Sequence, residues 1–297
     1  MRIPCWLALA TAVLTFTSEA PAQTPRRNVF LVTDYGNDDF YVGALKGGLL
    51  EKNPEASVHD ITHNIPAYDI RAGAYILAQA TDTLPPESIV VVVVDPGVGT
   101  ARRSVALKTK RGTTYIGPDN GLFTFVIERQ GVADFREITN KDAMRPSAHS
   151  STFHGRDIYG PAAGWLSRGQ PLEQLGPTIK DPVQFKVARA ERRGTSVHGE
   201  VVLADHYGNL LTNIPRELAE SMATPDPKEK TRKVVTVKLG GATVSFPLMS
   251  TYGNVPVGSP VAVINSVGNL ELAINQGNAS GNWNVKTGAA VELVPAR

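Results

Sequence analysis

The most constraining feature of this chain is an unbroken apolar run that stops at a carboxylate. Residues 89–94 read IVVVVV, and Asp95 follows them in the glycine-rich segment DPGVGTARR. β-Branched residues throughout a short run are typical of a central strand that is buried on both faces of a parallel sheet. In open parallel sheets, ligands bind just beyond the carboxyl ends of such strands. Asp95 is therefore predicted to lie where chemistry is done.

Around this run, short apolar strands alternate with helical patterns. The expected strands cover 29–32, 57–61 and 89–94, and the expected helices cover 40–52, 69–80, 122–129 and 157–166. Alternation of this kind predicts an α/β domain with a mostly parallel sheet.

After Arg193 the pattern changes to short strands of period two, separated by Gly, Asn and Pro turns. These strands are expected over 198–204, 234–239, 242–246, 261–264, 270–274 and 290–293. They predict a smaller all-β domain, a barrel or a sandwich. We expect the α/β domain to comprise residues 23–190 and the barrel-like domain to comprise residues 191–297.

The first 22 residues have the pattern of an export signal. Arg2 precedes an apolar stretch that begins near Cys5 and is too short to span a membrane, and small residues surround Ala22. We expect cleavage near Ala22 and a soluble periplasmic or secreted protein; a buried N-terminal helix is the alternative. Because Cys5 is the only cysteine, the mature chain would have no disulfide and no thiolate metal ligand.

Charge and metal-ligand spacing limit the possible partners. The formal net charge of +2 is too small to indicate a nucleic-acid partner. No pair of the six histidines forms the HExxH motif of a metal-binding helix. We therefore expect a small-molecule site without a metal or a cofactor.

Two other junctions carry polar residues that suit a ligand site. Asp34 ends the first strand, where an ionised carboxylate can accept two hydrogen bonds from a vicinal diol. Asp38 or Asp39 next to it is expected to cap the following helix. His154, in STFHGRD before a helix, has an ordinary pKa that suits proton transfer. The alternatives are a structural histidine and an N-cap role for Asp157.

Two glycine-containing turns in the second domain admit two interpretations each. DHYGN begins at Asp205 between apolar runs and is predicted to form a hairpin tip, and NSVGN begins at Asn265. Such residues serve either as turn formers or as hydrogen-bonding groups for a ligand.

Taken together, these segments resemble the S-adenosylmethionine (SAM) hydroxide adenosyltransferase family, the adenosine-forming SAM hydrolases related to fluorinase and chlorinase enzymes. The resemblance covers nearly the whole mature chain. It rests on TDYG at Thr33, DPGVGTARR at Asp95, PDNGL at Pro118, STFHGRD at Ser151, DHYGNLLTNI at Asp205 and NSVGNLELA at Asn265.

The resemblance implies a role for each matching residue. Asp95, Arg102 and His154 match the set that positions the attacking water in the hydrolases, whereas the halogenating relatives have other residues in place of the Asp and the His. Asp34 matches the aspartate that binds the ribose diol. The positions that hold the methionine amino end and the adenine are matched by Asp205, Asn209 and Ser266. The aromatic positions that pack around the nucleoside are matched by Tyr68 and Tyr252.

The resemblance also implies a homotrimer with sites between subunits. One position departs from the fluorinase pattern, because Val267 replaces the arginine found there. The expected reaction is attack by water or hydroxide on the ribose 5′ carbon of SAM, which gives adenosine and methionine.

Three alternatives remain from the sequence: an exported nucleoside- or SAM-binding protein without turnover, a SAM adenosyltransferase that uses halide, and a nucleoside hydrolase. The last comes from the acids between Asp34 and Asp39, which look like a DxDPGxDD calcium cluster. Val32 and Tyr35 replace two positions of that pattern and leave few hard oxygen ligands.

Overall fold

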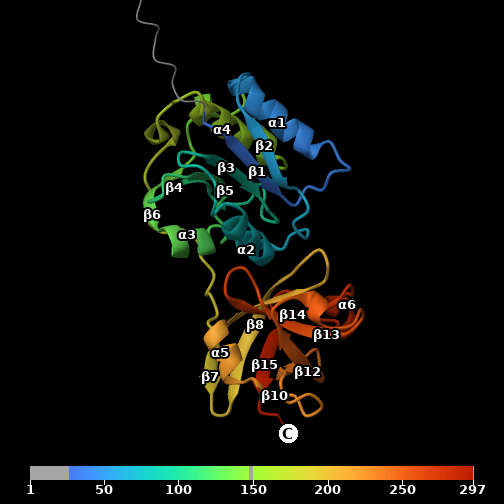
Figure 1. Ribbon diagram of the computed structural model, residues 1–297. Helices are drawn as coiled ribbons and strands as arrows, with labels where there is room; N and C mark the ends of the chain where they lie inside the picture. Colours follow the sequence, from blue (N-terminus) through green and yellow to red (C-terminus); the bar gives the residue numbers. More distant parts are fainter. Residues whose placement is uncertain (1–26, 147–149, 297) are drawn as a thin grey trace, which may run out of the picture.

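The computed structural model describes residues 27–146 and 150–296, so the predicted export signal lies outside the described residues. The chain forms an α/β domain followed by a β-barrel domain (Figure 1). Within the described ranges, no helix has the length and apolar character needed to cross a membrane.

A six-stranded sheet forms the centre of the first domain, in the order β2-β1-β3-β5-β4-β6. The strands β2, β1, β3 and β5 are parallel, and β4 is antiparallel to both of its neighbours. The mostly parallel α/β sheet is therefore confirmed. The elements are β1 Val29–Thr33, α1 Tyr41–Lys52, β2 Val58–Thr62, α2 Ile70–Ala80, β3 Ile89–Val93, β4 Ser104–Thr109, β5 Thr114–Pro118, α3 Thr124–Gln130, β6 Val132–Glu137 and α4 Gly160–Ser167.

Strand β3 is buried along its whole length because helices cover both faces of the sheet. Ile89, Val91 and Val93 belong to a core that includes residues of α1 and α4, whereas Val90 and Val92 belong to a second core with residues of α2 and α3. Figure 1 shows these helix pairs on opposite sides of the sheet. Burial on both faces explains why the run is apolar at every position rather than at alternate ones.

The second domain is a closed seven-stranded barrel, in the order β11-β12-β13-β14-β9-β8-β15, with β15 pairing back onto β11. The prediction of an all-β barrel is confirmed. Its elements are β7 Glu191–Arg193, β8 Ser196–Ala204, β9 Leu210–Pro215, α5 Arg216–Ser221, β10 Thr224–Pro225, β11 Lys233–Leu239, β12 Ala242–Met249, β13 Pro260–Ile264, β14 Asn269–Ile274, α6 Ala279–Trp283 and β15 Ala290–Val294.

The segment that joins the domains is held by Asp119, from the PDNGL motif. The Asp119 carboxylate accepts hydrogen bonds from Nε of Arg103 and from the backbone N–H of Val183, at 2.9 and 2.8 Å. Across the domain boundary, Arg71 of α2 donates to Glu200 of β8 at 2.6 Å. The Asp119 contacts give the PDNGL motif a structural role next to the segment that joins the two domains.

The predicted cap at Asp38 or Asp39 is wrong, and so is the alternative N-cap role for Asp157. Phe40 is the N-cap of α1 and makes no side-chain capping bond, so neither Asp38 nor Asp39 caps this helix. Asp157 lies inside a π-helical turn, η2 Gly155–Tyr159, where its buried carboxylate pairs with Arg156. A buried ion pair satisfies this carboxylate, whereas a cap needs a side chain at the helix boundary.

Candidate functional site

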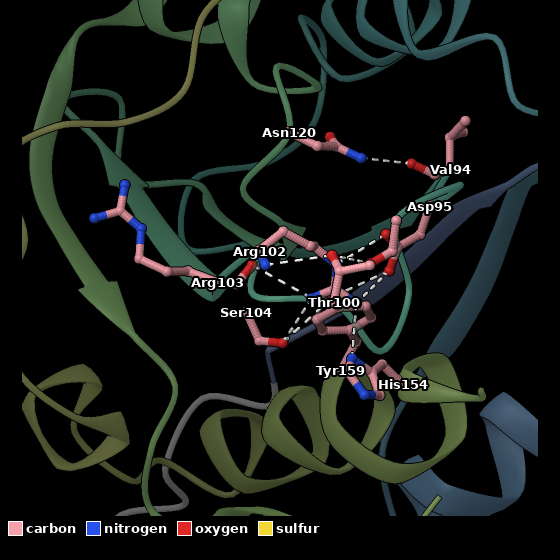
Figure 2. Close-up of polar contacts among 10 residues, drawn as sticks. Val94, Asp95, Thr100, Arg102, Arg103, Ser104, Asn120, His154 and Tyr159 are labelled. Carbon is pink, nitrogen blue, oxygen red and sulfur yellow. Dashed lines mark hydrogen bonds and ion pairs between the residues drawn. The ribbon is translucent and has the colours of Figure 1, made fainter. Parts of the chain in front are cut away.

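Asp95, Arg102 and His154 form one hydrogen-bonded cluster at the carboxyl end of β3. Nε and Nη2 of Arg102 donate to Oδ1 and Oδ2 of Asp95 in a two-point ion pair, with Nε–Oδ1 at 2.8 Å. Nη2 of Arg102 also lies 2.7 Å from Nδ1 of His154 (Figure 2). The Arg102 and Asp95 side chains are only 9% and 5% exposed, so the pair is shielded from solvent.

The contact with Arg102 fixes the protonation state of the imidazole. A guanidinium has donors and no acceptor, so Nδ1 of His154 must accept and the ring proton must reside on Nε2. Burial, and then the positive charge of Arg102, lower the pKa of His154 below its usual value. His154 is therefore a neutral donor through Nε2 near neutral pH.

Two residues that sequence reasoning missed support this cluster. Ser104, at the start of β4, accepts from Nη1 of Arg102 at 3.1 Å. Its hydroxyl and that of the fully buried Tyr159 are 3.4 Å apart, and the Tyr159 hydroxyl lies 3.5 Å from Oδ2 of Asp95. Burial raises the pKa of Tyr159, so the phenol stays protonated. The available signal for Tyr159 in the sequence was its position five residues after His154.

The local fold also fixes the position of the Asp95 backbone. Asn120 of the PDNGL segment donates from Nδ2 to the carbonyl of Val94 at 2.9 Å, as Figure 2 shows. Gly155 follows His154 directly, and a Cβ at this position would lie 2.3 Å from the Tyr35 hydroxyl. Glycine is needed there because the Tyr35 side chain occupies the space beside the backbone.

The cluster borders a cavity of about 390 Å³, termed the front cavity. Asp34, Asp95 and His154 line it together, as predicted for residues at neighbouring strand and helix ends. Aromatic side chains form much of the remaining lining, namely Tyr35, Tyr41, Tyr68 and Phe153. Aromatic faces beside a carboxylate provide the surroundings that a nucleoside needs, with stacking for the base and an acceptor for the ribose.

Asp34 and Tyr68 are joined through the backbone. The N–H of Tyr68 donates to Oδ2 of Asp34 at 3.0 Å, and Tyr68 adopts a φ of 66°. The Tyr68 side chain is 74% exposed at the rim of the front cavity. Burial raises the pKa of Asp34, and the Tyr68 N–H partly offsets this effect.

The predicted hairpin turn at Asp205 is confirmed between β8 and β9. Oδ1 of Asp205 accepts from the backbone N–H groups of Tyr207 and Asn209, and Oδ2 accepts from the Asn209 amide at 3.1 Å. In the same way, Oδ1 of Asn265 accepts from the backbone N–H groups of Val267 and Asn269. Asp205 and Asn209 therefore act as turn formers here.

Tyr252 is oriented by a residue that the sequence did not reveal. Its hydroxyl donates to Oε1 of the buried Glu271 at 2.5 Å. Burial raises the pKa of Glu271, and the negative charge of Asp205 adds to this effect. Tyr252 is partly exposed and Ser266 is exposed, so both present atoms at the surface of the barrel.

The structure thus divides the predicted residues into two groups within one chain. The front cavity is lined by residues of the α/β domain. The barrel carries Asp205 and Asn209 between β8 and β9, Tyr252 between β12 and β13, and Ser266 between β13 and β14. In the part of the chain that the structure describes, no group of three or more His, Cys, Asp or Glu side chains has the arrangement of a metal site. In place of a calcium cluster, Asp34 is engaged by the Tyr68 backbone.

Comparison with known proteins relates both domains to one family. The N-terminal and C-terminal domain models of the SAM hydroxide adenosyltransferase family match residues 29–176 and 199–292. A protein of Thermus thermophilus named (R)-S-adenosyl-L-methionine hydrolase is 37% identical over 90% of this chain and all of its own length. A fluorinase of Actinoplanes sp. is 28% identical, over 90% of this chain and 97% of its own.

A solved structure has the same fold. An uncharacterized conserved protein of Thermotoga maritima superposes with a TM-score of 0.81 at 36% identity, over 90% of this chain and 99% of its own. The two matched domains, the agreement along nearly the full length of the relatives and the shared fold lead to one conclusion. The chain belongs to the SAM hydroxide adenosyltransferase family.

Proposed function

We propose that this protein is a SAM hydrolase, in which water attacks the ribose 5′ carbon and gives adenosine and L-methionine. The observation that carries the proposal is the Asp95–Arg102–His154 cluster at the wall of a cavity that also contains Asp34. The relatives named as (R)-S-adenosyl-L-methionine hydrolases support it.

The chemistry needs few groups. A sulfonium is a good leaving group and departs as a neutral thioether, so no general acid or metal is required at sulfur. The protein must hold a water in line with the breaking C–S bond and accept its proton. His154 would orient the water by donating from Nε2, and Asp95 keeps free lone pairs to accept the proton. Arg102 stabilises the developing hydroxide because it stays cationic.

Asp34 would bind the ribose diol, and the aromatic lining would surround the base. From a neighbouring subunit, Asp205, Asn209 and Ser266 would hold the methionine amino end and the adenine, and Tyr252 would pack against the nucleoside. Tyr68, exposed at the rim of the front cavity, would be covered in that assembly. We therefore propose a homotrimer with sites between subunits.

Isotope labelling tests the reaction. In H₂¹⁸O with SAM, the label should enter the 5′ hydroxyl of adenosine and leave methionine unlabelled. Binding of SAM without products would support the non-enzymatic alternative. A 5′-halogenated nucleoside formed in chloride buffer would instead support a halide-using adenosyltransferase.

Mixed oligomers test the shared site. Asp95→Ala and Asp205→Ala chains should each be inactive, and activity should return when they are mixed, because some sites then receive both intact residues. A matched mixture of Asp95→Ala with His154→Ala chains should stay inactive, since both changes fall in the same half of the site. If light scattering shows a monomer and that monomer is active, the proposed assembly is wrong.

We further propose that the protein is exported. The pattern of Arg2, the apolar stretch and the small residues before Gln23 supports removal of a signal. The mature N-terminus should begin close to Gln23, which N-terminal sequencing of periplasmic or secreted protein can measure. Recovery of the full-length chain only from the cytosol would contradict it.

A further inference from the structure

A second cavity lies behind Arg102 and His154. It has a volume of about 370 Å³ and is termed the rear cavity. Its lining includes Arg102 and His154 together with the polar residues Thr100, Lys141 and Ser151. These three polar residues are exposed, so the rear cavity is in contact with bulk solvent.

A thin wall separates the rear cavity from the front cavity. Val98 and Thr152 line the front cavity, whereas their neighbours Gly99 and Ser151 line the rear cavity. A Cβ at Gly99 would lie 2.3 Å from the carbonyl oxygen of Ser151, so the two loops touch at this point. Successive residues of each loop therefore face different cavities.

The proposed water-positioning residues are part of this wall. Asp95 lines the front cavity, Arg102 lines the rear cavity, and the two-point ion pair joins them. Of the residues that the structure describes, His154 is the one that lines both cavities. The hydrogen-bonded cluster thus has one side toward the nucleoside pocket and one side toward solvent.

We propose that the rear cavity supplies the attacking water and receives the proton that the reaction releases. The inference rests on the proposed SAM hydrolysis. Displacement at carbon requires the nucleophile to approach opposite the leaving sulfur, and a substrate that fills the front cavity blocks solvent from the mouth of that cavity. The rear cavity remains in contact with solvent and borders Arg102 and His154, which hold and adjoin Asp95 of the front cavity.

The step balances without another reactant. The water oxygen forms a bond to the 5′ carbon as the C–S bond breaks, and the bonding pair remains on sulfur as neutral methionine. Asp95 accepts the extra proton from the attacking oxygen, and water beside His154, the described residue that lines both cavities, carries it to the rear cavity. Arg102 has no acceptor and carries no proton in this step; it holds Asp95 and His154 in place, and its charge stabilises the developing hydroxide.

Ala101 offers a position where the rear cavity can be filled without touching the proposed cluster. It lines the rear cavity and not the front one, and its side chain is exposed. Replacing it with Val, Leu and Trp gives a graded series. We expect kcat to fall with side-chain volume, by about tenfold or more for Ala101→Trp, while the Kd for SAM stays unchanged. Ala133→Trp is the matched control, because Ala133 is exposed on β6 and lines neither cavity.

The outcomes separate the two proposals. No adenosine from the unaltered protein would overturn both, whereas normal hydrolysis with an unchanged kcat in Ala101→Trp would overturn the water route alone. If the Trp variant fails to fold, Ala101→Leu with an unchanged Kd for SAM gives the same comparison. A crystal structure with adenosine bound should also show ordered waters from the rear cavity to His154, and a dry rear cavity would contradict the route.

Discussion

Nη2 of Arg102 lies 2.7 Å from Nδ1 of His154 and donates to the Asp95 carboxylate at the same time. One guanidinium nitrogen therefore binds the Asp95 carboxylate and sets the tautomer of His154. Protonation of Nδ1 would place two donors against each other, which explains why the imidazole stays neutral in this arrangement.

This arrangement predicts the acid limb of the pH profile. The pKa of His154 is lowered from its usual 6.5 by burial and by Arg102. The neutral form therefore persists as the pH falls through 6.5, and kcat/KM should decline only below that value. A profile of kcat/KM against pH measures the midpoint, and a midpoint at or above 6.5 would contradict the assignment. His154→Asn keeps an acceptor for Arg102 and should remove this limb.

Conservative changes at Arg102 should be as damaging as truncation. Arg102→Lys keeps the charge, but its donors share one nitrogen and cannot reproduce the two-nitrogen fork that pairs with Asp95 and also reaches His154. We expect kcat to fall by about 10²-fold or more with little change in the Kd for SAM. In the double variant Asp95→Asn/Arg102→Lys the loss should be less than additive, because the residues act as a unit. Additive losses would show that they act independently.

Asp34 should affect binding rather than turnover. A ribose-diol contact exists in the ground state and the transition state alike, so Asp34→Ala should weaken SAM and adenosine binding by a similar factor. Loss of a hydrogen bond to a charged group corresponds to about 10- to 100-fold in Kd. Calorimetry with both ligands measures this, and a large fall in kcat at saturating SAM would contradict it.

The sequence predicted the sheet and the strand ends well, because buried parallel strands and glycine turns have strong local patterns. Ile89–Val93 and the turn after it are such a case. The strands β4, β5 and β6 were not predicted. A short turn joins β4 to β5 without an intervening helix, and β6 follows directly on α3. The barrel strands were predicted from period-two alternation, and their closure through β11 and β15 depends on long-range pairing.

For the site, the residue types could be predicted but not their partners. Asp95 and His154 stand where a strand or a loop ends, which the sequence makes recognisable. Ser104 and Tyr159 resemble ordinary strand and helix residues, and they contact each other only because β4 and η2 meet in the fold. Glu271 is similar, because a glutamate inside β14 shows its bond to Tyr252 only after the barrel closes. The exposed turn containing Ser266 could be placed on the barrel, whereas its proposed position opposite another subunit depends on assembly.

Tyr159→Phe should separate packing from polar support. The ring packs with both Arg102 and His154, with Cζ of Arg102 5.7 Å from the ring centroid, and phenylalanine preserves this contact. The lost hydroxyl makes only long contacts, at 3.4 and 3.5 Å. We expect a decrease in kcat of less than about tenfold, since each neutral hydrogen bond contributes about 1 kcal/mol. A loss equal to that of Asp95→Asn would give the phenol a direct part in the reaction.

Gly99→Ala should disrupt the wall between the two cavities. Gly99 has a φ of 79°, which costs an L-residue about 1–2 kcal/mol, and its new Cβ would lie 2.3 Å from the Ser151 carbonyl. The clash is with backbone, so the loops carrying Asp95 and His154 must move apart. We expect a lower Tm from the strain. We also expect kcat to fall, because Arg102 can no longer reach both Asp95 and His154. Gly258→Ala is the matched control: it has a φ of 80°, and no atom lies within 4 Å of its new Cβ. It should lower Tm by the strain alone and leave kcat unchanged, and equal kcat losses in the two variants would refute the role of the Gly99 contact.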